Sequence, residues 1–245
     1  PRDAQSKAEL VDKADWAMYN AKRKGRNQCA AFAVDKDHDK RAACREPWEE
    51  DLYLSTVHAL AAAVDARDHY TRRHSEVVAY YSSAIARQLG LADQIVADVG
   101  VAALLHDVGK IGVSDEILNK PGPLAEDEWA MIKLHPQVGA DIVKYVRSLL
   151  HIVTQIRHHH ERYDGGGYPD GLAGQDIPIG ARIIAVADAF DAMISDRPYR
   201  AALSVQQAVA ELAVQAGRQF DPQVVDAMNV VLATENDPAM SCSRR

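Results

Sequence analysis

The sequence has few cysteines, no long apolar run and no excess of positive charge, and each of these absences excludes a class of protein. Its three cysteines are Cys29, Cys44 and Cys242, and none lies in CxxC spacing. This argues against a disulfide framework or a thiolate zinc site and predicts a reducing compartment. No uninterrupted apolar run approaches the roughly 20 residues that span a bilayer. We therefore expect no membrane contact from this stretch of chain and a cytoplasmic location.

The charge balance is acidic, with 28 Lys and Arg against 35 Asp and Glu and a formal net charge of -7. This argues against an extended nucleic acid as a partner. A small anionic substrate stays compatible with it, because bound divalent ions supply positive charge locally. The 245 residues, 47% hydrophobic, suffice for one large domain or a domain with an appendage. Since the first residue is Pro1, we expect a piece of a longer chain.

The spacing of apolar residues predicts an almost wholly helical chain from Leu52 onward. Apolar residues recur at intervals of three and four over 52–64 and 77–89, with Gly90 placed to end the second helix. Further helices are expected near 92–106, 126–133, 136–160, 180–195, 204–217 and 221–233. Asp127 and Ser204 are candidate caps, and Pro222 is placed as the first residue of a helix. The extended loop 163–179 is rich in Gly, Pro and Asp, and loops of that length are usually functional.

The first 50 residues differ from the rest in pattern. Residues 6–24 predict an amphipathic helix with a basic end, and residues 28–34 a short strand. This piece is too small to hold a core of its own. Residues 35–50 hold many charges and little periodicity, which indicates a linker or helical connector.

The strongest sign of chemistry is the pair His106-Asp107, which follows the apolar run 101–105. Burying an unpartnered carboxylate there costs several kcal/mol or more. A metal ion removes that cost, because imidazole nitrogen and carboxylate oxygen both bind first-row metals. The alternative is a salt-bridged aspartate beside a core histidine.

Four further stretches carry ligand-type residues in similar surroundings. His74 stands where a helix begins, although a lone histidine there is often structural or exposed. His135 precedes Pro136, which restrains its backbone. Asp188 is the only charge in the apolar stretch 183–190 and needs a strong partner, whereas Asp191 caps or pairs instead.

The fourth stretch is the histidine run at 158–160. Successive helical side chains point about 100° apart, so His159 and His160 could reach two different ions, while His158 packs or is exposed. Glu161 fits an outer partner that orients an imidazole. A histidine-rich surface patch is the alternative. Taken together, the imidazoles and two carboxylates suit two first-row ions that bridge a hydroxide for in-line attack on a phosphoester.

The order of these motifs resembles the HD-GYP family of cyclic di-GMP phosphodiesterases, from about Leu60 to Asp221. The resemblance rests on His106-Asp107 with Gly109-Lys110, on the segment His159-His160-Glu161-Arg162-Tyr163-Asp164-Gly165-Gly166-Gly167-Tyr168-Pro169, and on Pro121-Gly122, Asp188 and 195–200 in the same order. It implies an all-α fold, an HD-type helical bundle. Residues 14–22 with 25–27 resemble the last helix and strand of a GGDEF domain, without its active-site motif. The expected domains are a GGDEF remnant over 1–34, a connector over 35–50, an HD-GYP domain over 51–238 and a tail over 239–245.

The resemblance also implies roles for individual residues. The implied metal ligands are His74, His106, Asp107, His135, His159, His160 and Asp188, with Asp107 as the bridge between two ions. Catalysis is assigned to His106, Asp107 and Lys110, and substrate binding to Lys110, Arg197, Arg200 and Tyr168. The ring of Tyr168 would stack on a guanine or be structural. Tyr70 stands where some members carry a glutamate for a third ion, so we expect two divalent first-row ions, iron or manganese first, with zinc, nickel or cobalt as alternatives.

The implied reaction is hydrolysis of cyclic di-GMP to pGpG, and on to GMP, through a metal-bridging hydroxide. One alternative is an HD hydrolase acting on another cyclic dinucleotide or nucleotide. The other is a non-catalytic cyclic di-GMP receptor. The candidate protein partners are a second copy of the chain, a GGDEF protein and a response regulator.

Overall fold

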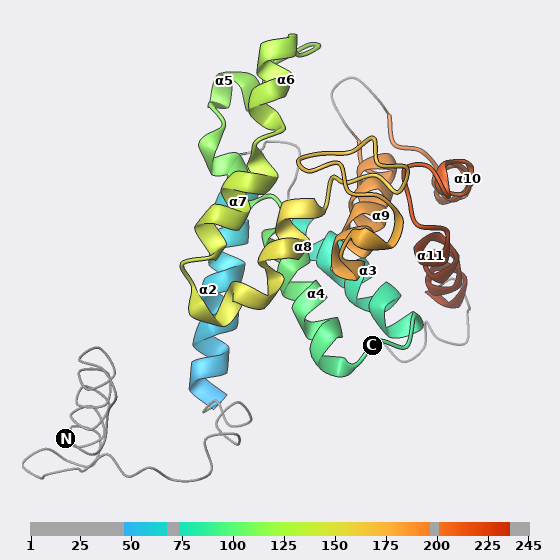
Figure 1. Cartoon of the computed structure of the whole chain (residues 1–245), viewed down its shortest axis with the longest axis horizontal. Helices are drawn as coiled ribbons and strands as arrows, with labels where there is room; N and C mark the ends of the chain where they lie inside the picture. The colour runs from blue at the N-terminus through green and yellow to red at the C-terminus, as the bar shows by residue number, and fades with distance from the viewer. Residues whose placement is uncertain (1–46, 68–73, 197–200, 236–245) are drawn as a thin grey trace, which may run out of the picture. The chain divides into compact units, whose positions relative to one another are not determined.

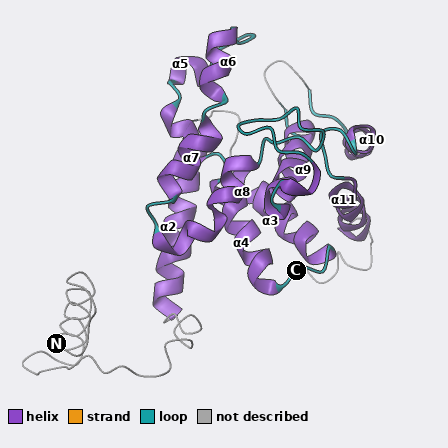
Figure 2. Cartoon of the chain, in the orientation of Figure 1, coloured by secondary structure: helices purple, strands orange, loops and turns teal. Residues whose placement is uncertain are grey.

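The part of the chain that the structure, a computed structural model, describes is residues 47–67, 74–196 and 201–235. This part is helical and contains no strand, which confirms the predicted all-α class (Figure 2). An isolated bridge between Ala216 and Phe220 is its only β pairing. None of its helices combines the length and the hydropathy needed to cross a membrane. The predicted GGDEF remnant and the tail lie outside the described residues, so the domain boundaries stay predictions.

Within the described residues, the longest stretch without a helix is the loop after α8. In chain order the helices are α2 (Pro47–Asp65), α3 (His74–Gln88), α4 (Asp93–Leu105), η2 (Val108–Gly112), α5 (Asp115–Leu118), α6 (Glu126–Ile132), α7 (His135–Val143), η3 (Arg147–Ile152), α8 (Val153–His158), η4 (Gly174–Asp176), α9 (Ile179–Ile194), α10 (Val205–Gln215) and α11 (Pro222–Glu235). The elements labelled η are short 3-10 helices.

Several predicted helix ends are confirmed together with their cause. Gly90 follows α3 with a φ of 71°, a conformation that costs glycine little. Ser204 and Gln207 form a reciprocal capping box at the start of α10. Asp221 accepts a hydrogen bond from the backbone of Gln223, so α11 begins with a cap.

Two predictions about helices are wrong. Asp127 does not cap α6, because the helix already begins at Glu126 and Asp127 is its second residue. The backbone amide of Ala125, which precedes the helix, donates to the side chain of Glu128. The single helix expected over 136–160 is three pieces, α7, η3 and α8. Val146 is extended at the break, and the change of direction lets α7 pack on η2 while α8 packs on α4 and α9.

The core lies between α3, α4 and α9, which contact one another, with α11 against α3 and α9. Figure 1 shows α3, α4 and α9 in the middle of the described part, with α2 along one edge and α10 and α11 at the other. Residues with no exposed surface come from all three central helices: Val78, Ile85, Ala86, Val99, Ala102, Ala103, Ile183, Ile184, Ala187 and Phe190. The ring of Tyr81 meets Phe190 edge-on at 5.2 Å. The same three helices carry four of the residues described next, His74, His106, Asp107 and Asp188, into the interior.

Candidate metal centre

The centre begins where α4 ends. This helix is apolar and buries Val99 and Leu105, so it carries the two residues that follow it into the interior. His106 is 1% exposed and Asp107 6% exposed. The short helix η2 follows at once and brings Lys110 back, with its Nζ 2.7 Å from Oδ2 of Asp107.

Five more predicted ligands reach the same place from four other segments. They are His74 at the start of α3, His135 at the start of α7, His159 and His160 directly after α8, and Asp188 within α9. Nε2 of His135 lies 3.2 Å from Oδ1 of Asp107, and Nε2 of His74 lies 3.3 Å from Oδ1 of Asp188. Side chains that are 114 positions apart in the sequence thus meet in one buried centre.

The seven side chains fall into groups whose ligand atoms lie within 4.8 Å of one another. One group is His74, His106 and Asp188, and another is His135, His159 and His160. A third group, His106, Asp107 and His159, joins the first two. The carboxylate of Asp107 stands between them, because its Oδ2 lies 3.3 Å from Nε2 of His106 and its Oδ1 faces His135. The arrangement therefore offers two adjacent subsites with a shared carboxylate.

Hydrogen bonds fix the tautomer of the central histidines. Nδ1 of His106, His135 and His159 each donates to a main-chain carbonyl three residues earlier, at 2.7, 2.6 and 2.7 Å. A carbonyl only accepts, so Nδ1 carries a proton in each ring, and each Nε2 presents a lone pair when the imidazole is neutral. Nε2 of His135 and Nε2 of His159 face each other at 3.3 Å, and Nε2 of His106 is buried without a hydrogen bond. Lone pairs turned inward suit a cation between them.

The charge states of His159, His160 and Asp107 agree with a ligand set, whereas the pKa of His106 is raised in the metal-free chain, because burial is outweighed by the contacts with Asp107. Burial lowers the pKa of His160 to about 4, assisted by the nearby charge of His135, and burial also holds the pKa of His159 well below its usual value. Burial alone would raise the pKa of Asp107, but the charges of Lys110 and His106 outweigh it and keep the carboxyl ionised. Neutral imidazoles and ionised carboxylates are the forms that bind metals.

His74, like His106, differs from His159 and His160 in having a raised pKa. Burial opposes its charging, but its contacts with Asp188 and Asp191 outweigh burial and raise its pKa to about 10. Its Nδ1 bonds to Oδ2 of Asp191 at 2.6 Å, so Asp191 pairs, as expected, and orients the imidazole toward Asp188. A cation beside Asp188 would take the place of the proton on Nε2.

The substrate-side predictions are placed unevenly. Lys110 lies at the centre, and the ring of Tyr168 lies 4.9 Å from that of His160, with the two ring planes tilted by 31°. Burial raises the pKa of Tyr168, so its phenol keeps its proton. Arg197 and Arg200, predicted to clamp the phosphodiester, lie outside the described residues, as does Tyr70.

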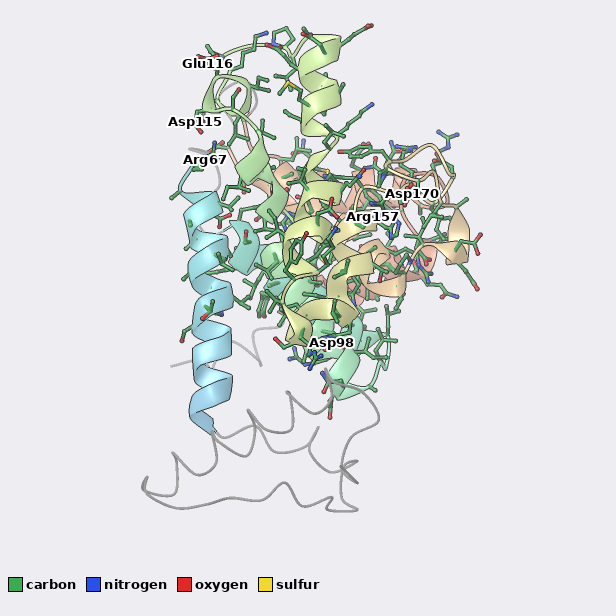
Figure 3. All side chains as sticks on the ribbon, turned by 60° about the vertical axis from the view of Figure 1, so that its left-hand side comes forward. Arg67, Asp98, Asp115, Glu116, Arg157 and Asp170 are labelled. Carbon is green, nitrogen blue, oxygen red and sulfur yellow. The ribbon has the colours of Figure 1, made fainter. Side chains whose placement is uncertain are left out.

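Three residues that sequence reasoning missed support the centre. Arg67 donates to the carbonyls of Ile111 and Val113 and pairs with Asp115, beside which Figure 3 shows it, so it holds η2 in place. Lys133 places its Nζ 5.7 Å from the ring centroid of Tyr168. The sequence feature that could have indicated Lys133 is its position two residues before His135. Ser75 donates to Asp65 directly after His74 and fixes the start of α3.

The segment from Glu161 to Gly171 folds back over the histidines. The amide of Tyr168 donates to the carbonyl of His160 at 3.2 Å. Gly167 passes so close that a Cβ there would lie 2.5 Å from Cα of Glu161. Glu161 was expected to orient an imidazole, but no hydrogen bond joins it to one among the described residues. Instead its Oε1 accepts the amides of Asp170 and Gly171, which fastens the loop.

Comparison with known proteins agrees with this geometry. The model of a family described as HD domain matches residues 58–224. The chain is 46% identical over 226 residues to the cyclic di-GMP phosphodiesterase PA4108 of Pseudomonas aeruginosa, covering 91% of this chain and 51% of that protein. It is 44% identical over 181 residues to the cyclic di-GMP phosphodiesterase response regulator RpfG of Xanthomonas campestris, covering 73% and 48%.

A third relative carries a different substrate in its name. The chain is 41% identical over 184 residues to the 3'3'-cGAMP-specific phosphodiesterase 3 of Vibrio cholerae, covering 75% of this chain and 40% of that protein. The chain spans about half the length, or less, of these relatives. Among solved structures, a cyclic GMP-AMP specific phosphodiesterase of V. cholerae (V-cGAP3) aligns with a TM-score of 0.59 at 20% identity, over 78% of this chain and 50% of that one. The protein Bd1817 of Bdellovibrio bacteriovorus aligns with a TM-score of 0.53 at 23% identity, over 75% and 60%. At these identities the structures support the fold alone.

Proposed function

Because this chain belongs to the HD domain family, we propose that it is a metal-dependent phosphodiesterase that hydrolyses cyclic di-GMP to pGpG, and on to GMP. One observation carries the proposal: seven histidine and aspartate side chains from five segments converge on one buried centre, with Nε2 of His106, His135 and His159 turned inward. Such a set is costly to bury without a cation. The names of the relatives direct the choice of substrate toward a cyclic dinucleotide.

The donor set fits two divalent first-row ions, with iron or manganese preferred over zinc, nickel or cobalt. His74, His106 and Asp188 would hold one ion and His135, His159 and His160 the other, with Asp107 shared. Nitrogen and oxygen ligands without a thiolate suit these metals. When bound, a pair of such ions lowers the pKa of a shared water and offsets phosphate charge.

The chain's own residues would orient the substrate and control protons. The ammonium of Lys110 lies 2.7 Å from Asp107 and is 19% exposed, so it can also meet an approaching phosphate oxygen as a point charge. Tyr168 offers a protonated phenol and a ring face beside His160. Arg197 and Arg200 remain predicted clamps for the phosphodiester, since guanidinium groups donate in pairs.

A second substrate, 3'3'-cGAMP, has one observation in its favour, namely that a relative 41% identical over 75% of this chain is named for it. A cyclic di-GMP receptor without turnover is the remaining alternative. Because cyclic dinucleotides act as bacterial second messengers, we place the activity in the cytoplasm. A second copy, a GGDEF protein or a response regulator remain the proposed partners.

The test is product analysis with the purified, metal-quantified 245-residue chain. Cyclic di-GMP, 3'3'-cGAMP and cyclic di-AMP are supplied separately, and linear dinucleotide and mononucleotide are resolved with time. We expect the fastest turnover with cyclic di-GMP. Equal or faster turnover of 3'3'-cGAMP would transfer the assignment to that substrate, and binding without any product would support the receptor.

Asp107→Asn should abolish turnover, because the amide cannot supply a bridging charge. The matched control is Asp98→Asn, which alters an aspartate within α4, the helix that Asp107 follows; Asp98 pairs with the surface residue His151 at 3.0 Å. Full activity in Asp107→Asn would refute the site. Loss of activity in both variants would point to general damage to α4.

A further inference from the structure

A second cluster of ligand-type side chains lies where α8 passes into the loop after it. His158, Glu161 and Asp170 bring one ligand atom each to within 4.8 Å of the others. None of the three belongs to the groups that make the metal centre. Because successive helical side chains point about 100° apart, His158 turns away from His159.

The imidazole of His158 is prepared in the same way as those of the metal centre. Its Nδ1 donates to the carbonyl of Thr154 at 2.8 Å, which fixes the proton on Nδ1. Its Nε2 then faces Oδ2 of Asp170 at 2.9 Å. A lone pair on Nε2 would face a carboxylate oxygen at this distance, so the contact needs either a hydrogen or a metal ion between the two atoms.

Glu161 supplies the independent observation. Its residue is 3% exposed, so the carboxylate is removed from water. Oε1 accepts the amides of Asp170 and Gly171 at 2.7 and 3.1 Å, whereas Oε2 is buried and has no hydrogen-bond partner among the described residues. Leaving a charged oxygen in that state is costly, and a bound cation removes the cost.

We propose that His158, Glu161 and Asp170 bind a divalent first-row ion, of which zinc is the best match, separate from the metal centre. One imidazole nitrogen and two carboxylate oxygens, with water in the remaining position, form a common zinc environment. Asp170 is the open side, since its side chain is 38% exposed. The ion would tie the loop segment that carries Tyr168 to the end of α8.

Arg157 defines the competing arrangement. It bonds both oxygens of Asp170 at 2.8 Å, and the two residues lie next to each other in Figure 3. A protonated His158 and Arg157 could therefore satisfy Asp170 without a metal. That arrangement leaves Oε2 of Glu161 unpartnered, which is why the ion is the better account.

The test is the number of zinc ions per chain after equilibrium dialysis, measured by elemental analysis. Glu161→Gln keeps an oxygen for the two amides and replaces Oε2 by an NH₂ group, which cannot bind a cation. The matched control is Glu128→Gln, since Glu128 also accepts a backbone amide, that of Ala125. We expect one ion fewer in Glu161→Gln and no change in Glu128→Gln.

The same pair of variants is then made in the Asp107→Asn background, which disables the metal centre. A loss of one ion with Glu161→Gln in both backgrounds supports a separate site. An unchanged count in either background overturns the proposal, and a loss only with Asp107 intact would show that Glu161 acts on the metal centre. Should Glu161→Gln fail to fold, the exposed change Asp170→Asn takes its place with the same expected counts. These outcomes concern ion number, so they are independent of which dinucleotide is cleaved.

Discussion

Replacing Asp191 by alanine should lower the metal affinity of the centre although every proposed ligand is kept. The carboxylate of Asp191 is buried, and its Oδ2 bonds to Nδ1 of His74 at 2.6 Å. This bond orients the imidazole and raises its basicity toward an ion on Nε2. Removing such an outer partner typically lowers metal affinity about 10- to 100-fold. That loss corresponds to ~1.4–2.7 kcal/mol of binding free energy.

Asp191→Asn separates orientation from charge. Asparagine retains an oxygen that can accept from Nδ1 of His74, but it carries no negative charge. We therefore expect the metal affinity of Asp191→Asn to lie between that of the wild type and that of Asp191→Ala. The matched control is Asp98→Ala, because Asp98 also pairs with a histidine, the surface residue His151.

The assay is competition for manganese or zinc against a chelator of known affinity, followed by turnover at saturating metal. We expect Asp191→Ala to recover most of its turnover when the ion is supplied in excess, because the proposed ligands are intact. Unchanged affinity in Asp191→Ala would refute the orienting role. A loss that saturating metal leaves unrepaired would mean that Asp191 acts on the reaction itself.

Two further predictions concern packing and pH. Gly109→Ala should destabilise the fold by ~1–3 kcal/mol or more and abolish activity, because a Cβ there would lie 1.9 Å from the carbonyl oxygen of His135. The control in urea unfolding is Gly112→Ala, whose Cβ would lie 3.5 Å from the nearest side-chain atom. Equal stabilities of the two variants would contradict the argument. In the metal-free folded chain the pKa of His160 is about 4, below its value of about 6.5 in the unfolded chain. As the pH drops, the unfolded chain therefore binds this proton first, and the free energy of unfolding falls between about pH 6.5 and pH 4. The contribution is up to ~3 kcal/mol, and His160→Gln should flatten this dependence in unfolding curves, whereas an unchanged slope would assign it to other groups.

For the two aspartates the residues alone pointed to a cation, because each stands in surroundings that require a partner, whereas the full set of proposed ligands came from the family resemblance. Asp188 is the only charge in its apolar stretch, and Asp107 follows the buried end of α4. A carboxylate in such a position predicts a cation wherever the chain brings histidines to it. The structure brings them together, while their role as ligands stays a proposal.

Contacts between distant segments could not be predicted in the same way. Arg67 reaches the carbonyls of η2 more than forty positions later, and His74 meets Asp191 across 117 positions. Nothing in the local periodicity of either segment specifies such a pairing. The break at Val146 has the same origin, since 136–160 contains enough apolar residues for a continuous helix and only the packing of α7 and α8 on different neighbours divides it.

Three of the five histidines of the centre, His106, His135 and His159, share a local arrangement that links helix ends to metal binding. The last carbonyls of a helix lack a partner within the helix. Ala103, Ile132 and Ile156 lie in the last turns of α4, α6 and α8, and each accepts from the Nδ1 of a histidine three residues later. One bond thus satisfies the helix end, fixes the tautomer and aims Nε2 away from the helix. A buried histidine just beyond a helix end is therefore prepared to bind a cation before any ion arrives, and His158, the last residue of α8, makes a similar bond to the carbonyl of Thr154 four residues earlier.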